Sequence, residues 1–198
     1  MQTVIRRLGL LFLAIGFVPG MAWPATPDRT VFGIAIGEPL NIPECSKYGF
    51  DLLHIPGPCA KSWGTIKETG EVKMTVWFPT NQTPSIVKSF PPVQISVLEG
   101  KVEYLFFSTR GISSQEDDLA QLKAKYGRPH KIDRPRMQNA LGAEFGAYRA
   151  SWTFPGLLVQ FEGTTGSIDE GRVKVITPRY KAIVEEWSKK KEEGRPKL

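Results

Sequence analysis

Residues 93–107 read VQISVLEGKVEYLFF, and this stretch decides the fold. Apolar and polar side chains alternate on both sides of Glu99-Gly100, which is typical of two half-buried strands. Glycine adopts positive φ without steric cost, so Glu99-Gly100 predicts the tight turn of an antiparallel hairpin. Leu105 and Phe107 fall on the face opposite Tyr104 and Phe106, so the returning strand is predicted to carry apolar side chains on both faces.

A helix is predicted directly after this hairpin, over residues 113–126. Ser113 and Glu116 have the spacing of a capping box, which satisfies free N–H groups at a helix start. Gly127 can end the helix in a left-handed conformation, and Pro129 prevents its continuation. Apolar residues at helical spacing predict one buried stripe, which consists of Leu119, Leu122 and Tyr126.

Further strands are predicted over residues 30–36, 72–78, 148–154, 157–161 and 172–176. Pro155-Gly156 suits the centre of a type II turn between two of them. Thr177-Pro178 opens a C-terminal helix, with threonine as the cap and proline at the first helical position. Its apolar side chains are expected to dock on the sheet and are Tyr180, Ile183, Val184 and Trp187.

This pattern predicts the α+β class, an antiparallel sheet with one or two helices packed on one face. The second half consists of a helix followed by a three-stranded meander. The first half could be a degenerate copy of it, with a cysteine-bearing loop in place of the helix. We therefore expect a single α+β domain over residues 23–188, followed by a charged flexible tail over residues 189–198.

The first 22 residues have the organisation of a signal peptide. Arg6 and Arg7 precede the apolar run 8–18, and Gly20-Met21-Ala22 supplies small residues before a cleavage point. Ala25 offers a second cleavage point, and an uncleaved anchor is the alternative. The run is shorter than the about 20 residues that span a bilayer, so no membrane anchor is expected after cleavage. A periplasmic or secreted protein is predicted.

Cys45 and Cys59 are the two cysteines of the chain. In an oxidising compartment such an isolated pair normally forms a disulfide. Their spacing matches neither a Cys-x-x-Cys redox motif nor a zinc motif. A structural disulfide is predicted.

Composition and motifs exclude several classes of function. The whole chain has a net charge of +6, and removal of Arg6 and Arg7 leaves +4, which disfavours nucleic-acid binding. The common nucleophile, zinc, phosphate-loop and EF-hand motifs are missing from the sequence. We expect no catalytic residue, metal or cofactor. The two histidines, His54 and His130, are interpreted as a surface-loop residue and a neighbour of the helix end.

A basic stretch after the predicted helix is the candidate for recognition. It lacks periodicity, and long irregular loops in compact domains are often functional. Arginine clusters bind carboxylates and phosphates, although a solvated basic loop is the plain alternative. The candidate residues are Arg128, His130, Lys131, Arg134, Arg136, Gln138 and Asn139.

One family resemblance is carried by the pattern Leu119-x-x-Leu122-x-x-x-Tyr126-Gly127-Arg128-Pro129, followed by a strand with Trp152 and a hairpin to Phe161. It resembles the repeat of the outer-membrane-assembly lipoprotein and β-lactamase-inhibitor-protein superfamily, over residues 110–177. The chain departs from it by lacking a lipid-attachment cysteine and by its long segment 129–148. The resemblance implies a protein-binding module without catalysis, and it transfers no site residues.

The predicted function is therefore an exported, non-catalytic binding module that recognises another protein, as an inhibitor or an envelope-assembly accessory. One alternative is a carrier that holds a small anionic or lipidic ligand on a concave sheet face. The other is a hydrolase with an unrecognised site near His54 or His130.

Overall fold

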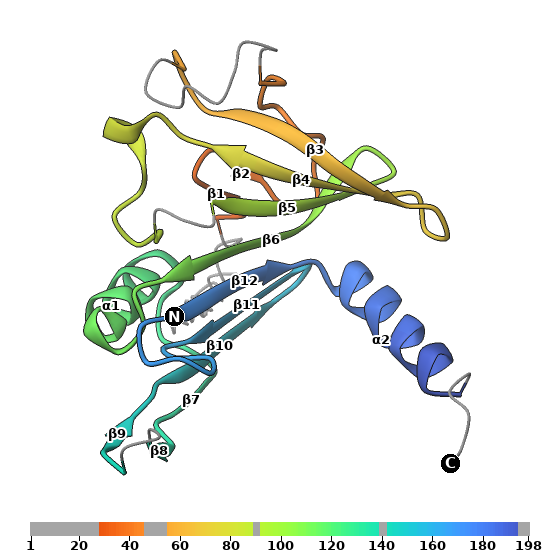
Figure 1. Ribbon diagram of the computed structural model, residues 1–198. Coiled ribbons are helices and arrows are strands. Elements are labelled where there is room, and N and C mark those ends of the chain that lie inside the picture. Colours follow the sequence, from red (N-terminus) through yellow and green to blue (C-terminus); the bar gives the residue numbers. More distant parts are fainter. Residues whose placement is uncertain (1–27, 46–54, 89–91, 139–141, 194–198) are drawn as a thin grey trace, which may run out of the picture.

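A computed structural model describes residues 28–45, 55–88, 92–138 and 142–193 (Figure 1). The predicted signal peptide lies outside the described residues. The strands are β1 (Thr30–Val31), β2 (Ile34–Ala35), β3 (Cys59–Ile66), β4 (Glu71–Trp77), β5 (Val93–Leu98), β6 (Lys101–Thr109), β7 (Lys131–Asp133), β8 (Arg136–Gln138), β9 (Glu144–Gly146), β10 (Arg149–Phe154), β11 (Leu157–Glu162) and β12 (Gly171–Ile176). The helices are α1 (Gln115–Tyr126) and α2 (Pro178–Glu193), with short 3-10 turns at Thr80–Gln82 and Gly111–Ser113.

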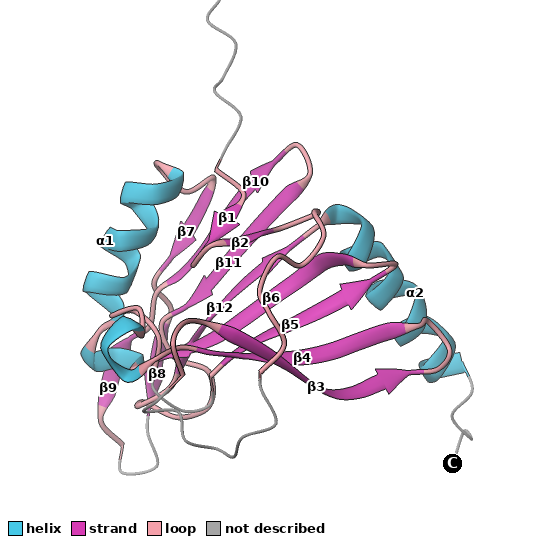
Figure 2. Cartoon of the chain, turned by 90° about the horizontal axis from the view of Figure 1, so that it is seen from above, coloured by secondary structure: helices cyan, strands magenta, loops and turns pink. Residues whose placement is uncertain are grey.

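The main sheet is antiparallel and has eight strands in the order β3-β4-β5-β6-β12-β11-β10-β7. It consists of two four-stranded meanders that join where β6 pairs with β12. Helix α1 follows the first meander and α2 follows the second, and Figure 2 shows the two helices on opposite sides of the fan of strands. The predicted α+β class is thus confirmed. The tandem repeat stays a prediction. In the structure, a helix follows each of the two meanders.

The core lies on one face of this sheet. Alternate residues of the central strands point into it, including Ile95, Leu105, Val159 and Val175, all at most 2 % exposed. The predicted stripe of α1 covers one part of this face, and the segment before residue 45 covers another part through Val31, Ile34 and Ile36. The opposite face of the sheet carries Lys73, Ser96, Tyr104, Phe106 and Lys174, and we call it the open face.

The predicted hairpin of residues 93–107 is confirmed as β5 and β6. Glu99 (φ 51°) and Gly100 (φ 78°) both have positive φ, as a tight hairpin turn requires. Ile95 lies opposite Leu105, and Ser96 lies opposite Tyr104. This register puts the apolar pair in the core and the tyrosine on the open face.

The prediction of a single strand over residues 30–36 is wrong. Phe32 (φ 52°) and Gly33 (φ 82°) form a turn, so β1 and β2 pair with each other as a miniature hairpin. The Phe32 ring packs against Phe78 and Phe107, with centroids 6.0 Å and 5.1 Å away. These ring contacts of the half-buried Phe32 help to hold a non-glycine residue at positive φ.

The predicted capping box of α1 is also wrong, although the helix is confirmed. Ser113 lies in a 3-10 turn and its hydroxyl donates to the carbonyl of Arg110. Ser114 is the residue before the helix, and its hydroxyl donates to Asp118 (2.7 Å). Gly127 ends the helix with a positive φ (74°), as predicted, although its ψ of −161° lies outside the left-handed helical region.

The predicted disulfide is confirmed between Cys45 and Cys59, whose Cα atoms are 4.8 Å apart. It holds the start of β3 against the chain that precedes residue 46, where the Cys45 N–H also donates to the Ala60 carbonyl (2.9 Å). The residues between 46 and 54, including His54, lie outside the described residues.

Reduction of this disulfide is expected to lower the free energy of unfolding by about 3 kcal/mol, because it frees a loop of about 15 residues in the unfolded chain. The melting temperature should fall by about 6–12 °C for a domain of this size. Thermal unfolding with and without reductant measures the shift. Free labelling of both thiols in the native exported protein would contradict the disulfide.

Candidate functional site

Helix α2 is exposed along most of its length, and it borders the candidate site. Thr177 caps its start, since its hydroxyl accepts the Tyr180 N–H (3.1 Å), as predicted. Only the first turn docks on the sheet, where Tyr180 stacks on Tyr104 with centroids 5.5 Å apart. Figure 1 shows the helix leading away from the end of β12.

The prediction that the whole apolar stripe of α2 docks on the sheet is therefore wrong. Tyr180 is 7 % exposed, but Val184 is 44 % and Trp187 is 39 % exposed. Helical periodicity identifies an apolar stripe, but it does not say whether the surface that covers the stripe belongs to the same chain. The helix also runs five residues into the segment expected as a flexible tail, since it ends at Glu193.

A buried polar network attaches α2 to the open face. The Tyr180 hydroxyl donates to Glu71 (2.7 Å) and lies 3.2 Å from the Ser96 hydroxyl. Arg179 pairs with Glu99 (2.7 Å) at the hairpin turn. Thr177 donates from its hydroxyl to the buried Glu103, which fixes the direction in which the helix starts.

Glu71 is the charged centre of this network. Its burial raises the pKa, but hydrogen bonds from Ser96 and Tyr180 and the ion pair with Lys73 (3.3 Å) outweigh that effect. The pKa of Glu71 therefore lies below its ordinary value. A carboxyl group with a lowered folded-state pKa stabilises the fold above its unfolded-state pKa, and that contribution is lost as the pH falls through the folded-state pKa.

We therefore expect Glu71→Gln to lower the melting temperature at pH 7 and to have a smaller effect at acidic pH, as the wild-type carboxyl takes up a proton below its lowered pKa. Thermal melts of both proteins across this range test the prediction. Glu185→Gln, which changes an exposed α2 carboxylate paired with Lys181 (3.6 Å), is the control. Equal losses from Glu71→Gln at both pH values would contradict the prediction.

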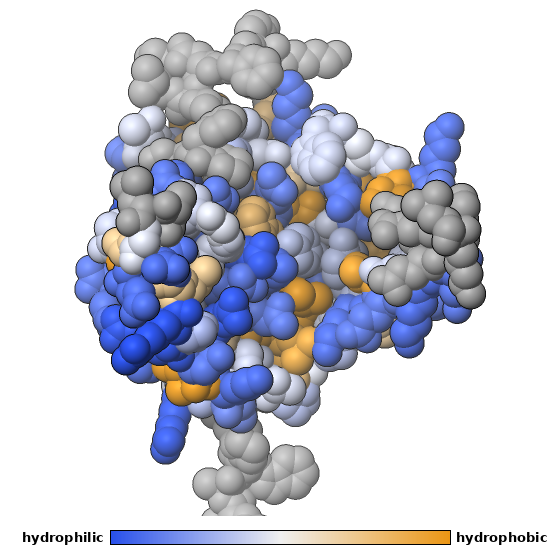
Figure 3. Space-filling model, turned by 60° about the horizontal axis from the view of Figure 1, so that its bottom comes forward, coloured by the Kyte–Doolittle hydropathy of each residue, from blue (hydrophilic) through white to orange (hydrophobic). Residues whose placement is uncertain are grey.

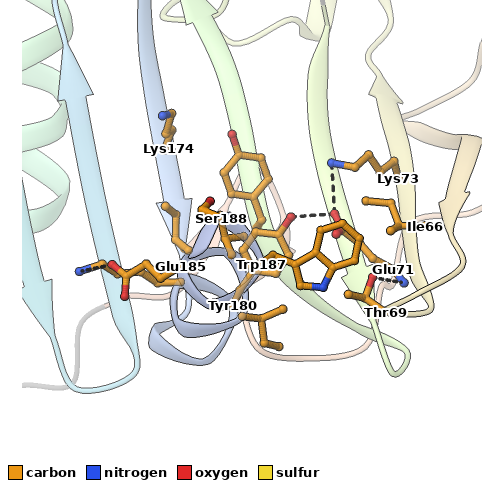
Figure 4. Close-up of a pocket in the computed structure, with 14 residues that line it drawn as sticks. Ile66, Thr69, Glu71, Lys73, Lys174, Tyr180, Glu185, Trp187 and Ser188 are labelled. Atoms are coloured by element: carbon orange, nitrogen blue, oxygen red, sulfur yellow. Dashed lines mark hydrogen bonds and ion pairs between the residues drawn. The ribbon is translucent and has the colours of Figure 1, made fainter. Parts of the chain in front are cut away.

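A hollow of about 530 Å³ lies between α2 and the open face, and we call it the α2 hollow (Figure 4). Its apolar lining combines two strand residues with the exposed stripe of the helix: Ile66, Ile176, Ile183, Val184 and Trp187. Its polar lining includes Lys73, Tyr104 and Lys174 from β4, β6 and β12. Figure 3 shows one side of the molecule on which apolar side chains lie exposed among hydrophilic ones.

The titratable groups of the α2 hollow are shifted by burial. Burial raises the pKa of Tyr104 to about 12, so its hydroxyl stays protonated at neutral pH and can donate a hydrogen bond. Burial and the nearby charge of Arg172 lower the pKa of Lys174. Lys174 forms no ion pair with any residue that the structure describes, since Glu162 pairs with Arg172 (2.7 Å). The α2 hollow thus offers a half-buried cation beside an apolar wall.

The predicted recognition loop is not irregular. Lys131 belongs to β7, the edge strand that pairs with β10, and Arg136 and Gln138 belong to β8, which pairs with β9. Sequence periodicity could not show this, because both strands have only three residues. Asn139 lies outside the described residues.

The candidate residues of this segment are not brought together as one cluster. Arg134 pairs with Glu116 (3.2 Å) and lies 4.6 Å over the Tyr148 ring. His130 accepts the Thr153 N–H at Nδ1 (3.0 Å) and packs edge-on against Phe154. His130 and Arg134 are exposed but make these contacts with the fold, and Arg128, Lys131 and Arg136 are also exposed.

Within the described part of the chain, no group of three histidine, cysteine or acidic residues could hold a metal ion. Among the same residues, none of the helices is sufficiently long and apolar to cross a membrane. Comparison with protein-family models, with curated proteins and with solved structures finds no match.

Proposed function

We propose that this chain is an exported, non-catalytic binding module that holds the apolar part of its ligand in the α2 hollow. The observation that carries the proposal is the exposed stripe of α2, which faces a sheet surface across a volume of about 530 Å³. Ligand sites typically have about 300–1,000 Å³ and combine apolar walls with a few polar groups. Among the functions considered from the sequence, this site favours the carrier.

The polar groups near the α2 hollow support binding rather than catalysis. Glu71 and Tyr180 are hydrogen-bonded to each other, and Lys73 pairs with Glu71. A general base must be able to reach the proton that it abstracts. Because Glu71 is already shared between Tyr180 and Lys73, it is poorly placed for that role.

Val184→Arg tests the proposed site, because it puts a charge into the apolar wall. Native mass spectrometry of protein purified from the cell envelope should find a bound small molecule on the wild type and lose it in this variant. Ala182→Arg is the matched control, since Ala182 is an exposed residue of the same helix that does not line the α2 hollow. Equal retention in both variants would place the ligand elsewhere.

The export part of the proposal is supported by the signal-peptide pattern of residues 1–22 and by the Cys45–Cys59 disulfide. We expect the mature protein to begin at Trp23. Mass analysis of the N-terminus from envelope fractions measures this directly. An intact Met1 on cytosolic protein would overturn export.

Recognition of another protein is the second candidate function. It is favoured by the exposed Arg128, Lys131 and Arg136 on and beside an edge strand, where a partner strand can add. The packing of α1 on the Trp152 strand also supports the resemblance to the envelope-protein superfamily named above. A pull-down from envelope extract should lose its partner when these three residues become glutamine, and retain it after Val184→Arg.

A further inference from the structure

We infer that the ligand of the α2 hollow is a single-chain amphiphile with an anionic headgroup. This inference rests on the function proposed above and adds the chemical class of the ligand. It is based on the separation of charge and apolar surface within the α2 hollow. Lys73 and Lys174 lie on the sheet, whereas most of the apolar wall lies on the helix, whose Lys181 is paired with Glu185 (3.6 Å).

The sheet side of the α2 hollow carries two lysines and one carboxylate, Glu71, which is paired with Lys73 (3.3 Å), so one cation remains for a negative charge. Lys73, Ser96, Tyr104 and Ile176 lie in one row across four strands. Lys174 is two residues from Ile176 on β12, so the two lysines are on strands about 14 Å apart, with Tyr104 between them. Figure 4 shows Lys73 and Lys174 on opposite sides of the α2 hollow.

Lys174 is the cation that a headgroup would neutralise. Its ammonium forms no ion pair within the described residues, while Lys73 is already bound to Glu71. A partly buried charge without a partner is unfavourable, and an anion placed beside it relieves that cost. The neighbouring Tyr104 hydroxyl can donate to the same anion, because it remains protonated at neutral pH.

The helix side is arranged for one apolar chain. Ile183, Val184 and Trp187 continue the stripe that starts at the docked Tyr180, so the wall is one stripe wide. From Tyr180 to Trp187 it extends about 10 Å along the helix. An amphiphile fits both sides at once, with its headgroup at Lys174 and its chain along α2. A free small anion would leave the stripe exposed to water.

Dodecanoate, with its chain and carboxylate, is the probe that tests this class. Titration calorimetry should show binding to the wild type at least about tenfold tighter than that of monododecanoyl glycerol, which has the same chain and no charge. Acetate should not bind measurably. Lys174→Gln should weaken dodecanoate binding about tenfold, as the loss of one charge-assisted contact predicts. The same substitution should leave the neutral probe unchanged.

Lys123→Gln is the control for this substitution, because Lys123 is an exposed residue of α1 that does not line the α2 hollow and should not affect dodecanoate. Equal binding of the charged and neutral probes, both lost in Val184→Arg, would overturn the anionic class and leave the proposed function standing. Dodecanoate binding that Lys174→Gln does not change would also overturn it. If neither probe binds and no small molecule co-purifies, the class and the proposed function both fail.

Discussion

Trp152→Ala is expected to lower the free energy of unfolding by about 3–5 kcal/mol, the usual cost of removing a large buried aromatic side chain. Trp152 is 0 % exposed and lies on β10 beneath the end of α1. Its ring packs against Tyr126 with centroids 6.1 Å apart, and its indole N–H donates to the Gly127 carbonyl (2.8 Å). The substitution therefore leaves a cavity and a helix-end carbonyl without its partner.

Urea denaturation and thermal melts measure this loss, which corresponds to a fall in melting temperature of about 6–20 °C. Trp187→Ala is the matched control, because it removes the same side chain from the exposed stripe of α2. We expect it to change stability by less than about 1 kcal/mol. Comparable losses in the two variants would mean that α2 is docked in solution, and would contradict the open α2 hollow.

Helix α1 and strands β10–β12 could be predicted from the sequence because their signals are local. Leu119, Leu122 and Tyr126 have helical spacing, and Trp152 stands in a strand of strict alternation. Gly127 and Gly156 mark ends where positive φ is needed, and both have it. At these positions the local preference agrees with the packing, whereas it does not at the Ser113 cap or along the stripe of α2.

The first half was harder to predict because tertiary contacts override local preference there. Phe32 takes positive φ only because its ring is held between Phe78 and Phe107. Strand β3 was missed, since the irregularity between Ser62 and Gly64 interrupts the alternation that would reveal it. A short sequence window shows neither the ring contacts of Phe32 nor the irregularity in β3.

The α2 hollow could not be predicted for a related reason. Its lining comes from β3, β4, β6, β12 and α2, which only the sheet order brings together. Lys73 and Lys174 alternate with apolar residues, as solvent-exposed lysines in strands also do. Periodicity therefore cannot identify them as residues that line a binding site. The one available sequence signal is the apolar stripe of α2, and helical periodicity predicts that this stripe docks on the sheet.

Gly111→Ala is expected to lower the free energy of unfolding by about 2–5 kcal/mol. Gly111 has φ 69°, and a left-handed conformation costs an L-residue about 1–2 kcal/mol. A Cβ at this position would also collide with the backbone of residues 168–170, and forcing atoms into a packed site adds about 1–3 kcal/mol. That backbone cannot withdraw easily, because the Ile112 N–H donates to the Ile168 carbonyl (2.8 Å).

Gly70→Ala separates the two contributions. Gly70 has φ 70°, almost the same as Gly111, but nothing lies within 4 Å of a Cβ built there. It should therefore lose only the about 1–2 kcal/mol of conformational strain. Urea denaturation of the two variants gives the excess loss at Gly111, which measures how tightly the 163–170 loop is held against the end of β6. Equal losses would show that this loop moves aside freely, and the close approach at Gly111 would then have no energetic weight.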